Sequence, residues 1–281
     1  MRKARTLTIT LVAAAVAVAG LVGTTSVTPA GAFTKGLPDR MAAIGDSITQ
    51  AANLDGSNIG AENPEHSWST GYDSGDIVTS HYERIRRVNK RINGNNFNDA
   101  VSGARMDDAP AQADRAVAQG VEYVTIEMGG NDVCTSDVTT MTTVASYEAN
   151  FRLTMQKLAA GLPAAKIYVL SVPDVYQLWA LFHNDWYASW LWDSFGICQA
   201  MLDDANTEAD RQAVRARNIE FNGVLRAVCA EYAQCRYDND GVFNYQFARS
   251  DVSGVDYFHP SMRGQANIAA RSWSSGYWPT V

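Results

Sequence analysis

The run V-E-Y-V-T-I-E-M at residues 121–128, followed by Gly129-Gly130-Asn131-Asp132, decides how the chain folds. β-Branched and aromatic residues dominate the run, which is typical of a β-strand, and the paired glycines end it. Four other short apolar stretches are strand candidates, at residues 41–44, 96–101, 166–172 and 235–237. The sequence therefore predicts up to five strands.

Helical patterns lie between these strands, at residues 77–92, 109–119, 141–160 and 208–232. The last of them repeats apolar residues at steps of three, four and seven, which is one face of a long helix. Strands that alternate with helices favour an α/β fold with a parallel sheet and helices on its faces. No repeat or linker interrupts the pattern, so we expect one domain over residues 33–281.

The first 32 residues have the form of an export signal. Arg2, Lys3 and Arg5 precede an apolar run over residues 7–22, and Ala30-Gly31-Ala32 is a small-residue cleavage site. The alternative is a membrane anchor, but the run is short and no charged cluster stops it. We therefore expect a secreted, extracellular protein that is cleaved after Ala32.

Charge and cysteine content narrow the possible partners. The formal net charge is −7, which argues against nucleic-acid binding and against docking to strongly anionic membranes. Four cysteines in an exported chain indicate two disulfides, for which three pairings exist. Proximity favours Cys229 with Cys235, which leaves Cys134 with Cys198. The cysteine spacings do not fit a zinc site.

Polar motifs follow three of the strands and should meet at one edge of the sheet, where open parallel sheets bind ligands. Gly45-Asp46-Ser47 would expose a serine hydroxyl at a tight turn, although such a serine is more often a helix cap. Near the end of the chain, Asp256 precedes His259 by three residues. That spacing lets the carboxylate orient the imidazole as a base for Ser47, although a chance surface turn is the alternative.

Two further motifs could stabilise an oxyanion. The amide of Asn131, at a strand end, can donate to a developing negative charge, and Gly103 can offer a backbone N–H. Both segments are also ordinary turn sequences.

Taken together, the blocks G-D-S, Gly, G-x-N-D and D-x-x-H resemble those of the SGNH hydrolases, also called GDSL esterases and lipases. The matching residues are Ser47, Gly103, Asn131 and His259, with Asp256 as the partner of the histidine. The resemblance implies a three-layer α/β/α flavodoxin-like fold with five parallel strands. It also implies a serine nucleophile, an oxyanion hole formed by Ser47, Gly103 and Asn131, and no metal or other cofactor. The stretches N-P-E-H-S-W-S-T-G at residues 63–71 and G-G-N-D-V-C at residues 129–134 are similar to the phospholipase B-like branch.

An aromatic segment, residues 175–195, holds four of the seven tryptophans. Trp179, Trp186 and Trp190 follow helical spacing, and we expect them to bind substrate or to touch lipid surfaces transiently. The alternative is a helix packed in the core. The segment favours lipid or phospholipid esters over the rival substrate, an O-acetylated carbohydrate. A catalytically inert binding module has no need of a base and an oriented carboxylate. We expect a monomer.

Overall fold

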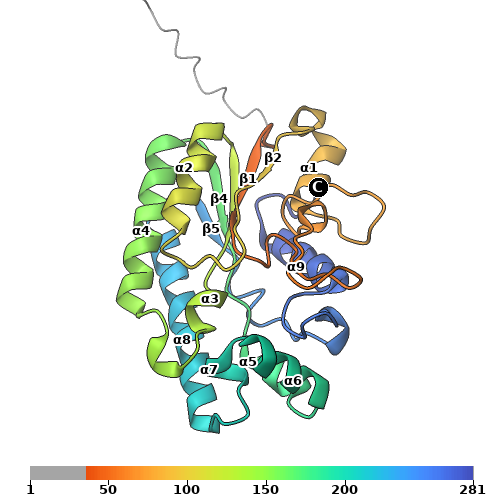
Figure 1. Cartoon of the computed structure of the whole chain (residues 1–281). Helices are drawn as coiled ribbons and strands as arrows, with labels where there is room; N and C mark the ends of the chain where they lie inside the picture. The colour runs from red at the N-terminus through yellow and green to blue at the C-terminus, as the bar shows by residue number, and fades with distance from the viewer. Residues whose placement is uncertain (1–35, 281) are drawn as a thin grey trace, which may run out of the picture. The chain divides into compact units, whose positions relative to one another are not determined.

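A five-stranded parallel sheet forms the centre of the molecule in the computed structural model, which describes residues 36–280 (Figure 1). Its strands are β1 (Met41–Gly45), β2 (Asn96–Asn98), β3 (Tyr123–Glu127), β4 (Lys166–Val169) and β5 (Cys235–Tyr237). All neighbouring pairs are parallel, and the order is β2-β1-β3-β4-β5. The predicted α/β fold with five parallel strands is confirmed. The export signal lies outside the described residues.

Helices cover both faces of the sheet, which makes the three layers of the flavodoxin-like fold (Figure 1). One face carries α2 (Ala109–Gln119), α4 (Val144–Gly161) and α8 (Glu208–Cys229). The other face carries α1 (His81–Val88) and α9 (Met262–Ser275). The shorter helices are α3 (Gly130–Val133), α5 (Tyr176–Phe182), α6 (Trp186–Phe195) and α7 (Gln199–Leu202). Short 3-10 turns lie at η1 (Pro64–His66), η2 (Lys90–Ile92), η3 (Val138–Thr140) and η4 (Arg249–Asp251).

Alternating side chains of the strands build two separate cores. Val124 and Ile126 of β3 pack in the apolar cluster beneath α2, α4 and α8, whereas Tyr123 packs in the cluster beneath α1 and α9. Burial of both faces explains why β3 carries large apolar or aromatic side chains on either face.

Disulfides join Cys134 to Cys198 and Cys229 to Cys235, which is the pairing set out above. The first ties the segment after α3 to the start of α7, and the second ties the end of α8 to β5. Across residues 36–280, no helix is both long and apolar enough to cross a bilayer.

Candidate active site

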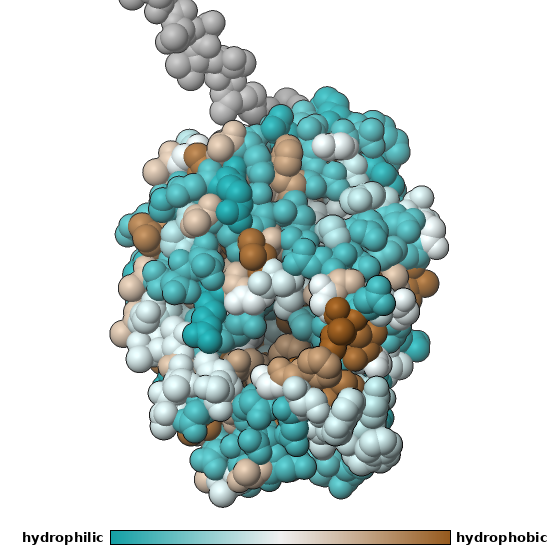
Figure 2. All heavy atoms as spheres, viewed as in Figure 1, coloured by the Kyte–Doolittle hydropathy of each residue, from teal (hydrophilic) through white to brown (hydrophobic). Residues whose placement is uncertain are grey.

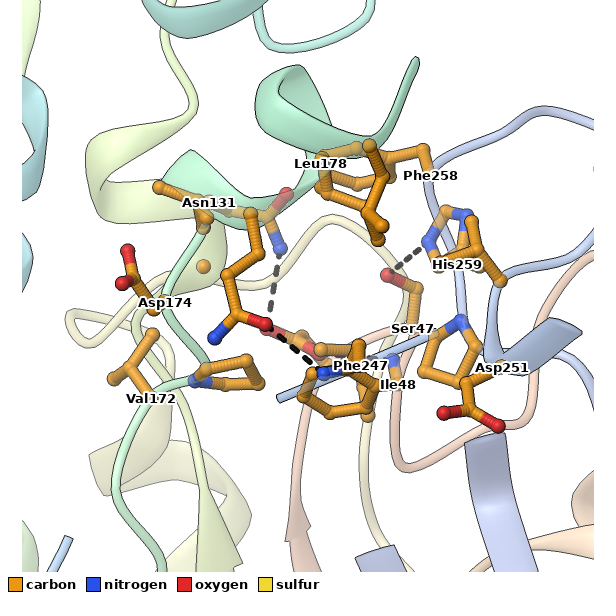
Figure 3. A pocket seen from close by; sticks show the side chains of 18 residues that line it. Ser47, Ile48, Asn131, Val172, Asp174, Leu178, Phe247, Asp251, Phe258 and His259 are labelled. Atoms are coloured by element: carbon orange, nitrogen blue, oxygen red, sulfur yellow. Dashed lines mark hydrogen bonds between the residues drawn. The ribbon is translucent and has the colours of Figure 1, made fainter. Parts of the chain in front are cut away.

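Three of the predicted residues, Ser47, Asn131 and His259, line one pocket at the carboxyl ends of the strands (Figure 3). Ser47 follows β1, Asn131 lies in α3 directly after β3, and His259 lies just before α9. Gly45 allows the tight exit from β1, because a Cβ there would come within 2.8 Å of the carbonyl oxygen of Glu127. The strand ends thus bring together segments that are far apart in the sequence.

Ser47, His259 and Asp256 form a continuous hydrogen-bonded chain. The Oγ of Ser47 lies 2.7 Å from Nε2 of His259, and Nδ1 of the same ring lies 2.5 Å from Oδ2 of Asp256. Figure 3 shows the bond between serine and histidine at the edge of the pocket. The geometry is that of a hydroxyl, a base and a carboxylate that fixes the imidazole tautomer.

Asp256 is 1% exposed, and donors surround its carboxylate. The backbone N–H groups of Phe258 and His259 donate to Oδ1, each at 3.0 Å, and the side-chain amide of Asn53 donates to Oδ2 at 2.6 Å. Burial alone would raise the pKa of Asp256, but the hydrogen bond and charge of His259 and the hydrogen bond of Asn53 outweigh burial and lower it. Asp256 therefore stays ionised beside the histidine.

Asp46, directly before the serine, has the opposite electrostatic environment. Its side chain is 1% exposed, and burial raises its pKa to about 6, although the Ile48 N–H donates to Oδ1 at 2.9 Å. The second carboxylate oxygen lies 3.4 Å from the Asn131 amide. Asp46 thus closes the turn after Ser47 and also faces Asn131.

The two other predicted oxyanion donors differ in their placement. Asn131 lines the pocket, and its amide donates to the carbonyl oxygen of Ala104 at 3.0 Å. Gly103 is exposed, has φ +81° and is not among the lining residues. Gly103 lies next to Ala104, whose carbonyl oxygen accepts the Asn131 amide, so the Gly103 loop is held to Asn131.

The pocket is mostly apolar and holds about 680 Å³, its open mouth included. Figure 2 shows a hollow edged by apolar side chains on this face of the molecule. Its apolar walls come from the segment after β4, from α5 and from the long loop before α9. The residues are Val172, Val175, Leu178, Leu181, Phe247 and Phe258. Besides Asp46, two acids line the pocket: Asp174 pairs with Arg215, and Asp251 accepts the Ala248 N–H.

The three tryptophans predicted to bind substrate do not line this pocket. They do not lie on one continuous helix, because Asp185 caps a new helix by accepting the N–H groups of Tyr187 and Ala188. Trp179 belongs to α5 and stacks on His183. Trp186 and Trp190 belong to α6 and are 79% and 52% exposed.

Several pocket residues carry no signal in the sequence. Leu178 and Leu181 lie in the aromatic segment, but on a different helical face from Trp179, and Phe247 lies in a loop. Asn53 follows Ser47 by six residues, and nothing in that spacing predicts a contact with Asp256. Within the described part of the chain, no group of three or more His, Cys, Asp or Glu side chains is placed to hold a metal.

Fold and site together define a three-layer α/β/α protein with a serine, a histidine and an aspartate in hydrogen-bond contact at one edge of the sheet. A family model for GDSL-like lipases and acylhydrolases matches residues 41–272. The chain belongs to this family, as the resemblance to SGNH hydrolases implies.

Individual relatives are more distant. The chain is 25% identical over 210 residues to "Phospholipase B1, membrane-associated" of Rattus norvegicus, a match that covers 64% of this chain and only 14% of that protein. Its fold is similar to that of Axe2, an acetylxylan esterase from Geobacillus stearothermophilus. That likeness has a TM-score of 0.54 and 18% identity, and it covers 85% of this chain and 94% of the esterase. At this identity it shows the fold alone.

Proposed function

We propose that the chain hydrolyses lipid or phospholipid esters with Ser47 as nucleophile, His259 as general base and Asp256 as the carboxylate that orients the base. One observation carries the proposal. The unbroken chain of contacts from Ser47 through His259 to Asp256 stands at the edge of a pocket whose mostly apolar walls suit an acyl chain.

The reaction has two halves. His259 takes the Ser47 proton as the serine oxygen attacks the ester carbonyl, and it then gives that proton to the leaving alcohol. The acyl group remains on Ser47. His259 next takes a proton from water, the resulting hydroxide attacks the acyl carbon, and the proton returns to Ser47 as the carboxylic acid leaves.

Three donors would stabilise the oxyanion: the N–H groups of Ser47 and Gly103 and the amide of Asn131. One amide hydrogen of Asn131 is held by Ala104, at 3.0 Å. The other has only a long contact of 3.4 Å with Asp46, so it is available to a substrate oxygen.

The apolar walls favour an acyl chain over an acetyl group. Leu178 and Phe258 lie beside Ser47 in Figure 3, and an acetyl group would leave most of this surface uncovered. An O-acetyl esterase for carbohydrates is the second candidate, because the Axe2-like fold is compatible with it.

We also propose that α6 touches lipid surfaces during catalysis. Trp186 and Trp190 stand one helical turn apart, are largely exposed and can sit at the boundary between acyl chains and head groups. Replacing both by Ala should reduce hydrolysis of micellar substrate by roughly tenfold, while a soluble butyrate ester is cleaved as before. Equal activity loss on both substrates would reject this contact.

We propose that the protein acts outside the cell. The export-like residues 1–32 and the two disulfides support this location. Expression with residues 1–32 present should release a protein that begins at Phe33, as N-terminal sequencing would report. A cell-bound product that keeps residues 1–32 would argue for an anchor.

A hydrolysis panel tests the reaction and its substrate. It compares p-nitrophenyl esters of rising chain length with phospholipid, lysophospholipid and acetylated xylan. Ser47→Ala should lower kcat by on the order of a million-fold, and a serine-directed phosphonate should label Ser47 in the wild-type protein. Retained activity in Ser47→Ala would disprove the mechanism, and a preference for acetylated xylan would support the second candidate.

A further inference from the structure

Asn53 is held in an unusual conformation beside the site. Its φ is +54°, in the left-handed region that Asn tolerates better than most residues, and its side chain is buried. Its Oδ1 accepts the N–H of Gly60 at 2.5 Å, and its backbone N–H donates to the carbonyl of Ala61 at 2.8 Å. The amide orientation is therefore fixed by its own loop.

The side-chain amide nitrogen of Asn53 points at Asp256. It donates to Oδ2 at 2.6 Å, the same oxygen that lies 2.5 Å from Nδ1 of His259. Because the backbone donors of Phe258 and His259 occupy Oδ1, the carboxylate has donors on both oxygens and cannot rotate freely.

The loop that holds Asn53 also binds the turn that carries Asp256 and His259. Ser253 donates its hydroxyl to the backbone carbonyl of Asn53, and the N–H of Gly254 donates to Oδ1 of Asp55 at 2.8 Å. The segment that leaves Ser47 therefore returns within a few residues to hold Asp256.

We propose that Asn53 is a positioning residue, which fixes the Asp256 carboxylate against His259 and couples its position to the loop that carries Ser47. This inference rests on the proposed roles of these three residues. Asn suits the position because it combines an amide donor, an amide acceptor and tolerance of a left-handed backbone. Leucine, glutamine or alanine would lose at least one of these properties.

Two variants separate positioning from folding. Asn53→Gly removes the amide but accepts the positive φ, and Asn239→Gly is its matched control, since Asn239 has φ +57° and does not line the pocket. Asn53→Asp keeps an acceptor for Gly60 and places a second carboxylate against Asp256 in place of a donor. The other acids of the pocket, Asp46, Asp174 and Asp251, are unchanged in every variant, and Asp46 is the one whose charge interacts with His259.

The measurements are kcat, KM, the pH dependence of kcat/KM and the melting temperature, all with a soluble p-nitrophenyl ester. Asn53→Gly should lower kcat by roughly tenfold to a hundredfold with KM nearly constant, because misplacing the base by about 1 Å costs up to that much. In Asn53→Asp a second carboxylate lies against Asp256, and the repulsion between the two charges raises the pKa of the pair. Asp256 is then ionised only at a higher pH, so the pH of half-maximal kcat/KM should rise. Asn239→Gly should match the wild-type protein in kcat and in the pH dependence of kcat/KM.

Two outcomes would overturn the inference. One is equal kcat in Asn53→Gly and Asn239→Gly. The other is a loss that tracks the folded fraction in thermal melts while the pH profile of Asn53→Asp stays at its wild-type position. Ser47→Ala is measured alongside, because retained activity there refutes the proposed reaction itself. Inactive Ser47→Ala with fully active Asn53→Gly refutes only the positioning role.

Discussion

The apolar pocket predicts a steep dependence of activity on acyl-chain length. Every methylene that the pocket removes from water contributes about 0.8 kcal/mol, or roughly fourfold in kcat/KM. Hexanoate has four methylenes more than acetate, so the ratio of the two kcat/KM values should reach roughly 200-fold if all four are buried. Leu178 lies on α5 beside Ser47 and is half-buried, so its side chain adjoins this path.

Leu178→Trp should shorten the pocket without touching Ser47 or His259. If tryptophan displaces two methylenes, the lost burial is about 1.6 kcal/mol, so the ratio of hexanoate to acetate activity should fall roughly fifteenfold. Leu153→Trp, at a 43% exposed position on α4, is the matched control and should leave the ratio unchanged. Initial rates with p-nitrophenyl acetate, butyrate and hexanoate measure this ratio for the wild-type protein and both variants. An equal fall on all three esters would show that the acyl chain does not lie along Leu178.

Three further predictions concern the oxyanion, the long disulfide and a buried histidine. Asn131→Ala should lower kcat by roughly a hundred- to a thousandfold with little change in KM, whereas a large rise in KM would make Asn131 a binding residue. Replacing both Cys134 and Cys198 by Ala opens a loop with a sequence separation of 64, so the free energy of unfolding should fall by roughly 4 kcal/mol, as measured by urea denaturation; an unchanged midpoint would contradict this. Burial lowers the pKa of His81 from 6.5 to about 3. Between these two pH values the histidine is protonated in the unfolded chain but neutral in the folded one, so the fold loses stability as the pH falls from 6.5 toward 3. The stability difference between wild type and His81→Gln should therefore shift in favour of the variant on acidification, and a pH-independent difference in thermal melts would refute this assignment.

The strands and most helices could be predicted because local signals agree with the tertiary structure. The predicted helix over residues 109–119 and the strand over 235–237 have the bounds found for α2 and β5. Other bounds moved where a side chain starts the helix. Ser80 caps α1 by accepting the Glu83 N–H, so the helix predicted from residue 77 begins at His81.

The aromatic segment shows where periodicity fails. Trp186 follows Trp179 at a helical spacing of seven, but Asp185 offers its carboxylate to two backbone N–H groups and starts a second helix. A single capping side chain thus rotates the following residues away from the preceding face. The pocket wall then comes from Leu178 and Leu181, whose apolar character alone did not distinguish them from core residues.

The contact between Asn53 and Asp256 marks the deeper limit of sequence reasoning. The catalytic roles proposed for Ser47 and His259 follow from the chemistry of each side chain and from its place after a strand or in a D-x-x-H block. The role of Asn53 depends instead on a left-handed backbone, a bond to Gly60 and a partner 203 residues away in the sequence. None of these is a local property of residue 53. Residues that position a catalytic group are therefore found only when the fold has closed the distance between them.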